Sequence, residues 1–359
     1  NVSAEHCYSD WREMAALERF ADIVVISTQD DMHVEPVKAF AAKGYHILLE
    51  KPMAPDLQGC REILQAVKDN QIQMSVCHVL RYTKYTRKIK ELLQSGCIGD
   101  IVSIQHLEQV KYWHQAHSFV RGNWRNSQES SPMILAKSCH DLDWLRYIMD
   151  CSCLRVSSFG SLYHFRSENK PAAAAERCLD CPQEIENSCP YSAKRFYLGR
   201  VRKGEIHWPL DVLCPNPDEN SITEALRTGP YGRCVYACDN DVVDHQVVNM
   251  EFANGRSVSF TMTAFTLDGG RKTTIFGTHG QLIGDGSKIE VCRFNDESRL
   301  IIDTAASSDD VSGGHGGGDG GIVDSLQNAI LSPASAENLS DPEVSLESHL
   351  IAFAAEISR

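Results

Sequence analysis

The amino-acid sequence predicts an α/β protein: a parallel sheet domain with crossover helices, followed by an α+β domain with a large, mostly antiparallel sheet. Residues 20–100 alternate short apolar runs with amphipathic segments, as β-α-β units do. Beyond about residue 100, long alternating stretches are separated by tight-turn residues, which favours antiparallel strands. We expect the first domain at residues 1–104, the second at 105–340 and a closing helix within 341–359.

Apolar spacing places the elements of the first domain. Ile23–Ile26 is β-branched and unbroken, which predicts a strand buried on both faces. A helix from about Val34 should end at Gly44, and another should run to Gly96. Asp56 should cap a helix whose buried residues recur every three to four positions. These residues are Leu57, Cys60, Ile63, Leu64 and Val67. Two further strands are predicted on either side of this helix, at His46–Leu49 before it and at Gln73–Cys77 after it.

In the second domain, Asn254-Gly255 separates two alternating stretches and predicts a hairpin, because both residues suit the positive φ angles of a type I′ turn. Further strands are expected near residues 273–276, 282–283, 289–292 and 300–302.

Composition excludes several classes of protein. The 359 residues carry a net charge of −13, which argues against nucleic acid as a partner. No apolar stretch approaches the roughly 20 residues of a membrane helix, so no membrane partner is expected. The 14 cysteines are too sparse for a disulfide scaffold and predict reduced thiols and a cytoplasmic location. An export signal ahead of Asn1 stays an open alternative.

Polar side chains follow the predicted strands of the first domain at Ser27–Asp30, Glu50-Lys51 and His78–Arg81. Because ligands of open α/β sheets bind at the carboxyl ends of the strands, these segments should meet in one crevice. Five motifs follow one another in the order and spacing of the Gfo/Idh/MocA oxidoreductases. They are the ADIVVIST segment, Glu50-Lys51-Pro52, Gly96-x-Ile98-Gly99, Trp124-Arg125 and His140-x-x-Asp143. The chain resembles this family over most of its length.

The resemblance implies NAD or NADP on a Rossmann domain and a sugar-like or polyol substrate against the antiparallel sheet. Lys51 matches the catalytic lysine, whose ammonium polarises the substrate oxygen during hydride transfer. The expected cofactor contacts are Ser27, Thr28, Gln29, Asp30, His33, Glu50, Lys51, Pro52, Trp124 and Arg125. The resemblance also implies that the last helix packs back on the first domain, and that the large sheet forms the interface of a homo-oligomer.

His140 matches the acid/base histidine of the family. It lies at the start of a predicted helix with Ser138 as N-cap and Asp141 as the acid of a capping box, where a neutral imidazole is favoured. Many relatives have an Asp four residues earlier, where this chain has Ala136, so Lys137 is a candidate to take part. A His140 that only satisfies capping bonds is the structural alternative.

Further substrate contacts are predicted at Arg81, Tyr82, Lys137 and Asp143. A surface Arg-Tyr pair is the alternative for the first two. The glycine-rich stretch Ser307–Gly321 permits close backbone approach to a ligand, and its His315 and Asp319 could bind sugar hydroxyls. A flexible surface loop is the alternative.

The resemblance implies that the Cys-rich stretch of about residues 165–240 is an insertion that compact members of the family lack. Within it, Cys178-x2-Cys181-x7-Cys189 begins as a zinc half-site does, and Cys234 is the favoured fourth ligand of a structural zinc. Cys238, Cys214 and His207 are other candidates for that ligand, and free thiols or an Fe–S cluster are alternatives to zinc.

No G-x-G-x-x-G precedes Ile23, where this family has one in its first β-α-β unit. We therefore expect an N-terminally truncated Rossmann-type domain in a fragment of a longer gene product. The predicted function is reversible hydride transfer between NAD(P) and a hydroxyl-bearing carbon. The alternatives are an NAD-dependent, redox-assisted glycoside hydrolase, which has a similar His-Gly-Gly stretch, and a cofactor-free binding or regulatory relative.

Overall fold

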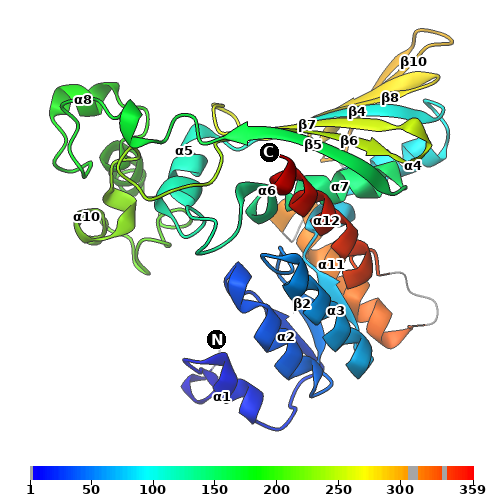
Figure 1. Ribbon diagram of the computed structural model, residues 1–359, viewed down its shortest axis with the longest axis horizontal. Coiled ribbons are helices and arrows are strands. Elements are labelled where there is room, and N and C mark those ends of the chain that lie inside the picture. The colour runs from blue at the N-terminus through cyan, green and yellow to red at the C-terminus, as the bar shows by residue number, and fades with distance from the viewer. Residues whose placement is uncertain (1–2, 306–313, 334–337) are drawn as a thin grey trace.

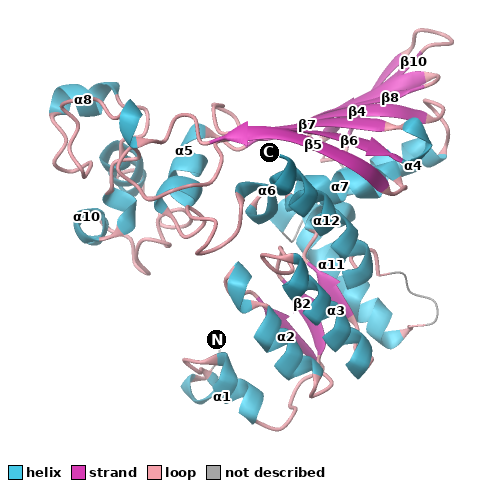
Figure 2. Cartoon of the chain, viewed as in Figure 1, coloured by secondary structure: helices cyan, strands magenta, loops and turns pink. Residues whose placement is uncertain are grey.

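The computed structural model describes residues 3–305, 314–333 and 338–359. Its fold is α/β, with a small parallel sheet at one end of the molecule and a large mixed sheet at the other (Figures 1 and 2). The small sheet has the order β1 (Ile23–Ile26), β2 (His46–Leu49) and β3 (Met74–Val76), all parallel. A short helix, α1 (Trp11–Ala16), precedes it.

Helices cover the two faces of the small sheet unequally. On one face, α2 (Val34–Ala41) and α3 (Leu57–Asn70) bury Val24 and Ile26. On the other, α11 (Gly314–Leu331) packs against Leu48 of β2. The expectation that Ile23–Ile26 is buried on both faces is wrong, because Ile23 is 36% and Val25 60% exposed. The physical reason is that β1 is the edge strand of the described sheet, and no described helix reaches its second face.

The predicted helix ends are largely confirmed. The Oδ1 atom of Asp56 accepts a hydrogen bond of 2.7 Å from the backbone N–H of Gly59, and it caps α3. Helix α2 ends at Ala41, just before Gly44, whose φ of +75° suits glycine. A third helix of this region, α4 (Lys84–Gln94), has Thr83 as its N-cap and ends two residues before Gly96, where its end was predicted.

The large sheet has the order β11-β10-β9-β8-β4-β7-β6-β5. The pair β4–β7 is parallel and the other neighbouring pairs are antiparallel, which confirms a mostly antiparallel sheet. Asn254 and Gly255 have φ angles of 65° and 75° in the β6–β7 hairpin, as predicted. The strands are β4 (Ile101–Gln109), β5 (Cys153–Ser161), β6 (His245–Phe252), β7 (Ser257–Thr263), β8 (Gly270–Gly277), β9 (Gly280–Gly284), β10 (Lys288–Arg293) and β11 (Arg299–Asp303).

One face of this sheet packs on helices, among them α4, α6 (Met133–Ala136) and α7 (Cys139–Met149). The last helix, α12 (Pro342–Ser358), lies between the two sheets and contacts α3 and β3 on one side and α7 and β5 on the other (Figure 1). It therefore joins the two halves of the molecule.

Residues 162–244 connect β5 to β6 and form a separate lobe beyond the end of the large sheet (Figure 1). The lobe contains α8 (Gln183–Ser188), α9 (Gly199–Val201) and α10 (Glu219–Thr228). Helix α5 (Tyr112–His114) and the wider turns of Gln115–Arg121 lead from β4 toward it. In the described ranges, no helix has the length and apolar character that crossing a membrane requires.

Candidate active site

Lys51 connects the small sheet to the helices beneath the large one. It lies two residues after the end of β2, and its Nζ donates a hydrogen bond of 2.8 Å to the backbone carbonyl of Ala136, the last residue of α6. The acceptor of the Lys51 ammonium is thus a backbone carbonyl, at the position where the resemblance led us to expect an Asp. The geometry brings Lys51 next to the helix that carries His140.

His140 lies in the first turn of α7, with a half-buried ring. Its Nδ1 is buried and has no hydrogen-bond partner among the described residues. Burial, and then the charge of Lys51, lowers the pKa of His140 well below the ordinary value of 6.5. The imidazole is therefore neutral at neutral pH, as a proton acceptor must be.

The capping box predicted around His140 is wrong, although the helix begins where expected. Ser138 makes no side-chain capping bond, and its Oγ donates to Oε2 of Glu108 at 2.8 Å instead. Asp141 is held by Arg271, with distances of 2.5 and 3.0 Å. These charge-assisted partners come from β4 and β8 and are stronger than a local capping bond.

Glu108, Asp141 and Arg271 belong to a buried network that the sequence analysis missed. Nε2 of His106 lies 2.9 Å from Asp141, and Nζ of Lys137 lies 3.5 Å from Glu108. Burial and the nearby Asp141 raise the pKa of Glu108, whereas Arg271 and His106 hold that of Asp141 low against burial. His106 and Glu108 occupy inward positions of β4, and polar residues at alternating inward positions are the signal that could have found them.

The predicted cofactor residues partly converge at the carboxyl edge of the small sheet. Trp124 donates its Nε1–H to Asp30 at 3.3 Å, and the ring of His33 lies between the carbonyls of Pro52 (2.8 Å) and Thr28 (3.2 Å). Asn123 donates to Gln29 at 2.6 Å. The loop around Trp124 thus lies against the end of β1.

The other predicted cofactor residues have different surroundings. Ser27 is exposed at the end of β1, and Glu50 accepts a hydrogen bond from the backbone N–H of Lys51 at 3.2 Å. Arg125 pairs with Asp239 of the lobe at 2.9 and 3.0 Å. It also pairs with Glu129, four residues further along the chain, at 2.8 Å.

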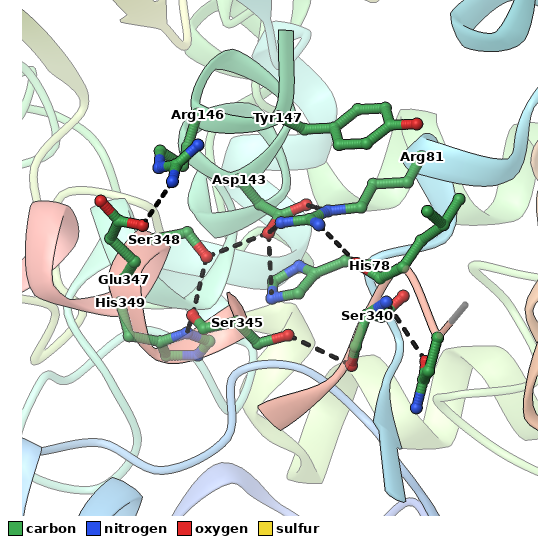
Figure 3. A network of polar contacts seen from close by, with 12 residues as sticks. His78, Arg81, Asp143, Arg146, Tyr147, Ser340, Ser345, Glu347, Ser348 and His349 are labelled. Atoms are coloured by element: carbon green, nitrogen blue, oxygen red, sulfur yellow. Dashed lines mark hydrogen bonds and ion pairs between the residues drawn. The ribbon is translucent and has the colours of Figure 1, made fainter. Parts of the chain in front are cut away.

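Three of the predicted substrate residues lie inside a closed polar network (Figure 3). The guanidinium of Arg81 donates two hydrogen bonds of 2.7 and 2.6 Å to Asp143, and Tyr82 shares one of 2.6 Å with Ser340. All three side chains are buried. His78 lies 3.7 Å from Asp143, and burial lowers its pKa to about 3. This network joins η3 (Val79–Tyr82), α7 and α12 and occupies these groups with protein partners.

His349 connects the same network to the Lys51 turn. Its Nδ1–H donates to the carbonyl of Ser345 at 2.8 Å, and its Nε2 accepts a hydrogen bond of 2.9 Å from the backbone N–H of Met53. Burial lowers the pKa of His349. The last helix therefore holds the turn that contains the candidate catalytic lysine.

The glycine-rich stretch is described from Gly314 onward, and Ser307–Gly313 lies outside the described residues. His315 has a φ of 54°, and its ring lies 6.4 Å from that of His140 between centroids. Its Nδ1 is 2.9 Å from Asp319. A Cβ at Gly318 would lie 2.5 Å from the carbonyl oxygen of Val79, so this glycine serves close packing on η3.

A cavity of about 510 Å³ opens beside His315, between the large sheet and η3. Its lining includes His106, Arg271, Thr273 and His315. It lies within the size range of small-molecule sites.

The structure brings the four predicted zinc ligands, Cys178, Cys181, Cys189 and Cys234, onto one small pocket of the lobe. Nη2 of Arg121 approaches the Sγ of Cys178 at 3.5 Å, and all four cysteines are free thiols. Within the described ranges, however, no three His, Cys, Asp or Glu side chains are arranged to hold a metal ion. Structural zinc stays a prediction.

Comparison with known proteins places the chain in a class. A profile of an oxidoreductase family with an NAD-binding Rossmann fold matches residues 1–78, and one of the family's C-terminal alpha/beta domain matches residues 90–311. The fold and these matches define an oxidoreductase of the Rossmann type. The chain belongs to the Gfo/Idh/MocA family.

Two relatives extend over most of the chain. YteT of Bacillus subtilis is 25% identical over 324 residues, 85% of this chain and 72% of that protein. Levoglucosan dehydrogenase of Pseudarthrobacter phenanthrenivorans is 28% identical over 307 residues, 85% of this chain and 63% of that protein. A solved levoglucosan dehydrogenase in complex with NADH and levoglucosan superposes with a TM-score of 0.68 at 19% identity, covering 98% of this chain and 81% of that one.

Proposed function

We propose that the chain carries the catalytic centre of an NAD(P)-dependent oxidoreductase that transfers a hydride between a nicotinamide and a hydroxyl-bearing carbon of a sugar or polyol. The observation that carries this proposal is that Lys51 donates a hydrogen bond to the end of α6, while the next helix, α7, carries a neutral His140 in its first turn. The first domain matches a family with an NAD-binding Rossmann fold. Levoglucosan dehydrogenase, a relative by sequence and fold, supports the substrate class.

The residues at this edge fit the nicotinamide end of a dinucleotide. The Nδ1 of His140 and the exposed Ser27 have no hydrogen-bond partner among the described residues, and the Trp124 loop lies against the edge beside Asp30. Thr28, Lys51 and Pro52 would lie along the bound ring. When bound, the nicotinamide supplies or accepts the hydride.

Residues of the chain stabilise the developing charge and transfer the proton. The ammonium of Lys51 donates a hydrogen bond to the reacting oxygen and stabilises its developing negative charge. The imidazole of His140 receives the hydroxyl proton during oxidation and returns it during reduction. Burial, and then the charge of Lys51, lowers the pKa of His140 and keeps that imidazole neutral before the proton arrives, and Lys137 adds a smaller contribution in the same direction.

We also infer a homo-oligomer that forms through the outer face of the large sheet. The packed helices lie on the inner face (Figure 1), whereas Leu154 and Phe159 of β5 are 62% and 69% exposed. Burying such side chains against a second copy would stabilise the assembly.

The test is native mass spectrometry of the protein from its natural source, followed by absorbance at 340 nm with NAD or NADP and a panel of sugars and polyols. A dinucleotide-sized adduct and reduced cofactor with one sugar would support the proposal. No adduct and no reduction across the panel would favour the cofactor-free alternative. Nitrophenol release from nitrophenyl glycosides, without net cofactor reduction, would favour the glycosidase alternative.

A further inference from the structure

A second recess, distinct from the cavity beside His315, lies on the other side of Arg271. It has a volume of about 270 Å³ and is lined by the end of β4 with Glu108, the segment after β4, Lys137, the start of β8 and one residue of the lobe. We call it the aromatic recess and define it by Lys111, Trp113, His114, Lys137, Trp208 and Arg271. None of its aromatic residues was singled out by the sequence analysis.

Aromatic rings form one wall of the aromatic recess. The rings of Trp113 and Trp208 are 5.4 Å apart between centroids, and Trp208 lies 5.1 Å from His114. Trp208 belongs to the lobe and is 48% exposed, so much of its indole is free to contact a ligand. The apolar C–H face of a sugar ring fits such a wall, because an indole offers a broad apolar surface.

The aromatic recess lies next to the catalytic centre. Lys51 and Lys137 both act electrostatically on His114 in the recess and on His140. Lys137 and Arg271, which line the recess, also contact the buried Glu108. The recess therefore shares Lys137 and Arg271 with the buried network of Glu108 and Asp141, and Asp141 directly follows His140 in α7.

Not every cation of the aromatic recess has a carboxylate partner among the described residues. Lys137 pairs with Glu108 at 3.5 Å, and Arg271 pairs with Asp141 at 2.5 Å. Lys111 makes no ion pair with the described residues, and its Nζ lies 6.0 Å from the centroid of Trp113. With the nearby Lys51 also lacking a carboxylate partner in the described ranges, the recess is net positive.

The backbone at Lys111 adopts φ and ψ angles that are unfavourable for a residue with a Cβ. Its φ of 73° with ψ of 137° is sparsely populated for a residue with a Cβ, and such strain concentrates at functional positions. Its N–H is held by the Oγ1 of Thr266 at 3.2 Å. A Cβ at Gly269 would lie 2.7 Å from Cε of Lys111, so glycine there makes room for the lysine side chain.

We propose that the aromatic recess binds the carboxylate of a sugar acid, with Lys111 as its ion-pair partner and Trp113 and Trp208 against the sugar ring. Because Lys137 and Arg271 already pair with Glu108 and Asp141, Lys111 is the lining cation without an ion-pair partner among the described residues. One such cation matches an anionic sugar with a single negative charge. This inference rests on the proposed function, whose substrate class it narrows.

The test measures binding rather than turnover, so that its failure is distinct from a failure of hydride transfer. Calorimetry with the full chain compares D-glucuronate and D-galacturonate with D-glucose and D-galactose. We expect one uronate to bind at least 10-fold more tightly than its neutral hexose, and the preference to shrink as salt is added. Equal affinities, binding of neither sugar, or tighter binding of glucose 6-phosphate would overturn the proposal.

Two variants and a control make the test specific. Lys111→Gln should remove most of the preference for the uronate while leaving the affinity for the neutral hexose unchanged. Lys111→Gly should do the same, and glycine tolerates the positive φ, so loss of the fold is not the cause. Lys272→Gln removes the same charge from an exposed position next to Arg271 and should change nothing. Retention of the preference in both Lys111 variants would contradict the proposal.

Discussion

At the scale of single residues, Lys51 and His140 are placed by parts of the chain that lie far apart in sequence. The carbonyl of Ala136 accepts a hydrogen bond from the lysine ammonium, and His349 holds the backbone two residues further on. The histidine is desolvated in the first turn of α7. Each residue thus has a fixed position and, for His140, a fixed protonation state before any ligand binds.

Replacing Lys51 tests the role of its ammonium. Lys51→Met keeps the length of the side chain but removes the charge and the donors, so the reacting oxygen loses its stabilisation. We expect kcat to fall by about 10²–10³-fold, the usual effect of losing such a donor, with a smaller change in KM. Steady-state kinetics at 340 nm measure both. An unchanged kcat would show that Lys51 does not touch the reacting oxygen.

The pH dependence of turnover tests the protonation state of His140. Because its pKa is lowered well below 6.5, the neutral, proton-accepting form persists as the pH falls below that value. We expect kcat to be flat from pH 8 to pH 6, with the acidic decline at lower pH, and His140→Asn to abolish this decline together with most of the activity. A decline centred near pH 6.5 in the wild type would contradict a desolvated His140.

At the scale of elements, α12 packs against both segments that position the candidate catalytic residues. Its His349 reaches the turn after Lys51, and its Ser348 donates to Asp143 of α7 at 3.0 Å (Figure 3). One helix therefore contacts both elements that carry the candidate catalytic residues.

Removing the His349 contact should affect catalysis through Lys51. His349→Phe keeps an aromatic ring but leaves the Met53 N–H without its acceptor, so the Lys51 turn is free to shift. Since small misplacements cost about 10²-fold in rate, we expect kcat to fall 10- to 100-fold with KM nearly unchanged. The control is Leu350→Ala on the exposed side of α12. Equal losses in the two variants would indicate a general effect of the helix on folding.

The Cys-rich pocket of the lobe allows a direct test of the zinc prediction. Metal analysis of freshly purified protein should give one zinc per chain, because four thiols line one pocket. Cys181→Ser should lose the metal and lower the stability of the lobe, while Cys214→Ser, which lies outside that pocket, should retain it. Less than stoichiometric zinc in the wild type would contradict the prediction.

Local sequence patterns predicted the helices and strands well, but they could not predict which side chains pair across long distances in the sequence. The strand His46–Leu49 and the cap at Asp56 follow from neighbouring residues, and both are observed. In contrast, Arg81 and Asp143 looked like free ligand-binding groups, because nothing local shows that they pair across 62 residues. Ser138 and Asp141 fit a capping box, but buried partners on distant strands outcompeted it. The same limit hid the aromatic recess, whose Trp208 comes from the lobe.

At the scale of the whole molecule, several buried histidines make the fold sensitive to acid. Burial lowers the pKa of His78 to about 3, that of His114 to about 3 and that of His117 to about 4. In the unfolded chain these groups titrate near 6.5. Between pH 6.5 and about 4, the unfolded state therefore takes up protons that the native state refuses.

Stability should accordingly fall as the pH drops below 6.5. The upper bound is about 1.4 kcal/mol per pH unit for each of these histidines. Urea denaturation at pH 7.5, 6.0 and 4.5 measures the decline. His117→Gln removes one titrating group and should make the decline shallower. A constant free energy of unfolding across this range would contradict the assignment of these histidines as neutral in the native state.

The account as a whole depends on hydride transfer at the Lys51–His140 centre. The most direct measurement incubates the protein from its natural source with NAD or NADP and sugars deuterated at each hydroxyl-bearing carbon, and analyses the cofactor by mass spectrometry. The account predicts a reduced nicotinamide that carries the deuterium of one sugar carbon, and its absence in Lys51→Met. No reduced cofactor with any sugar or sugar acid, or reduced cofactor without the deuterium, would contradict it.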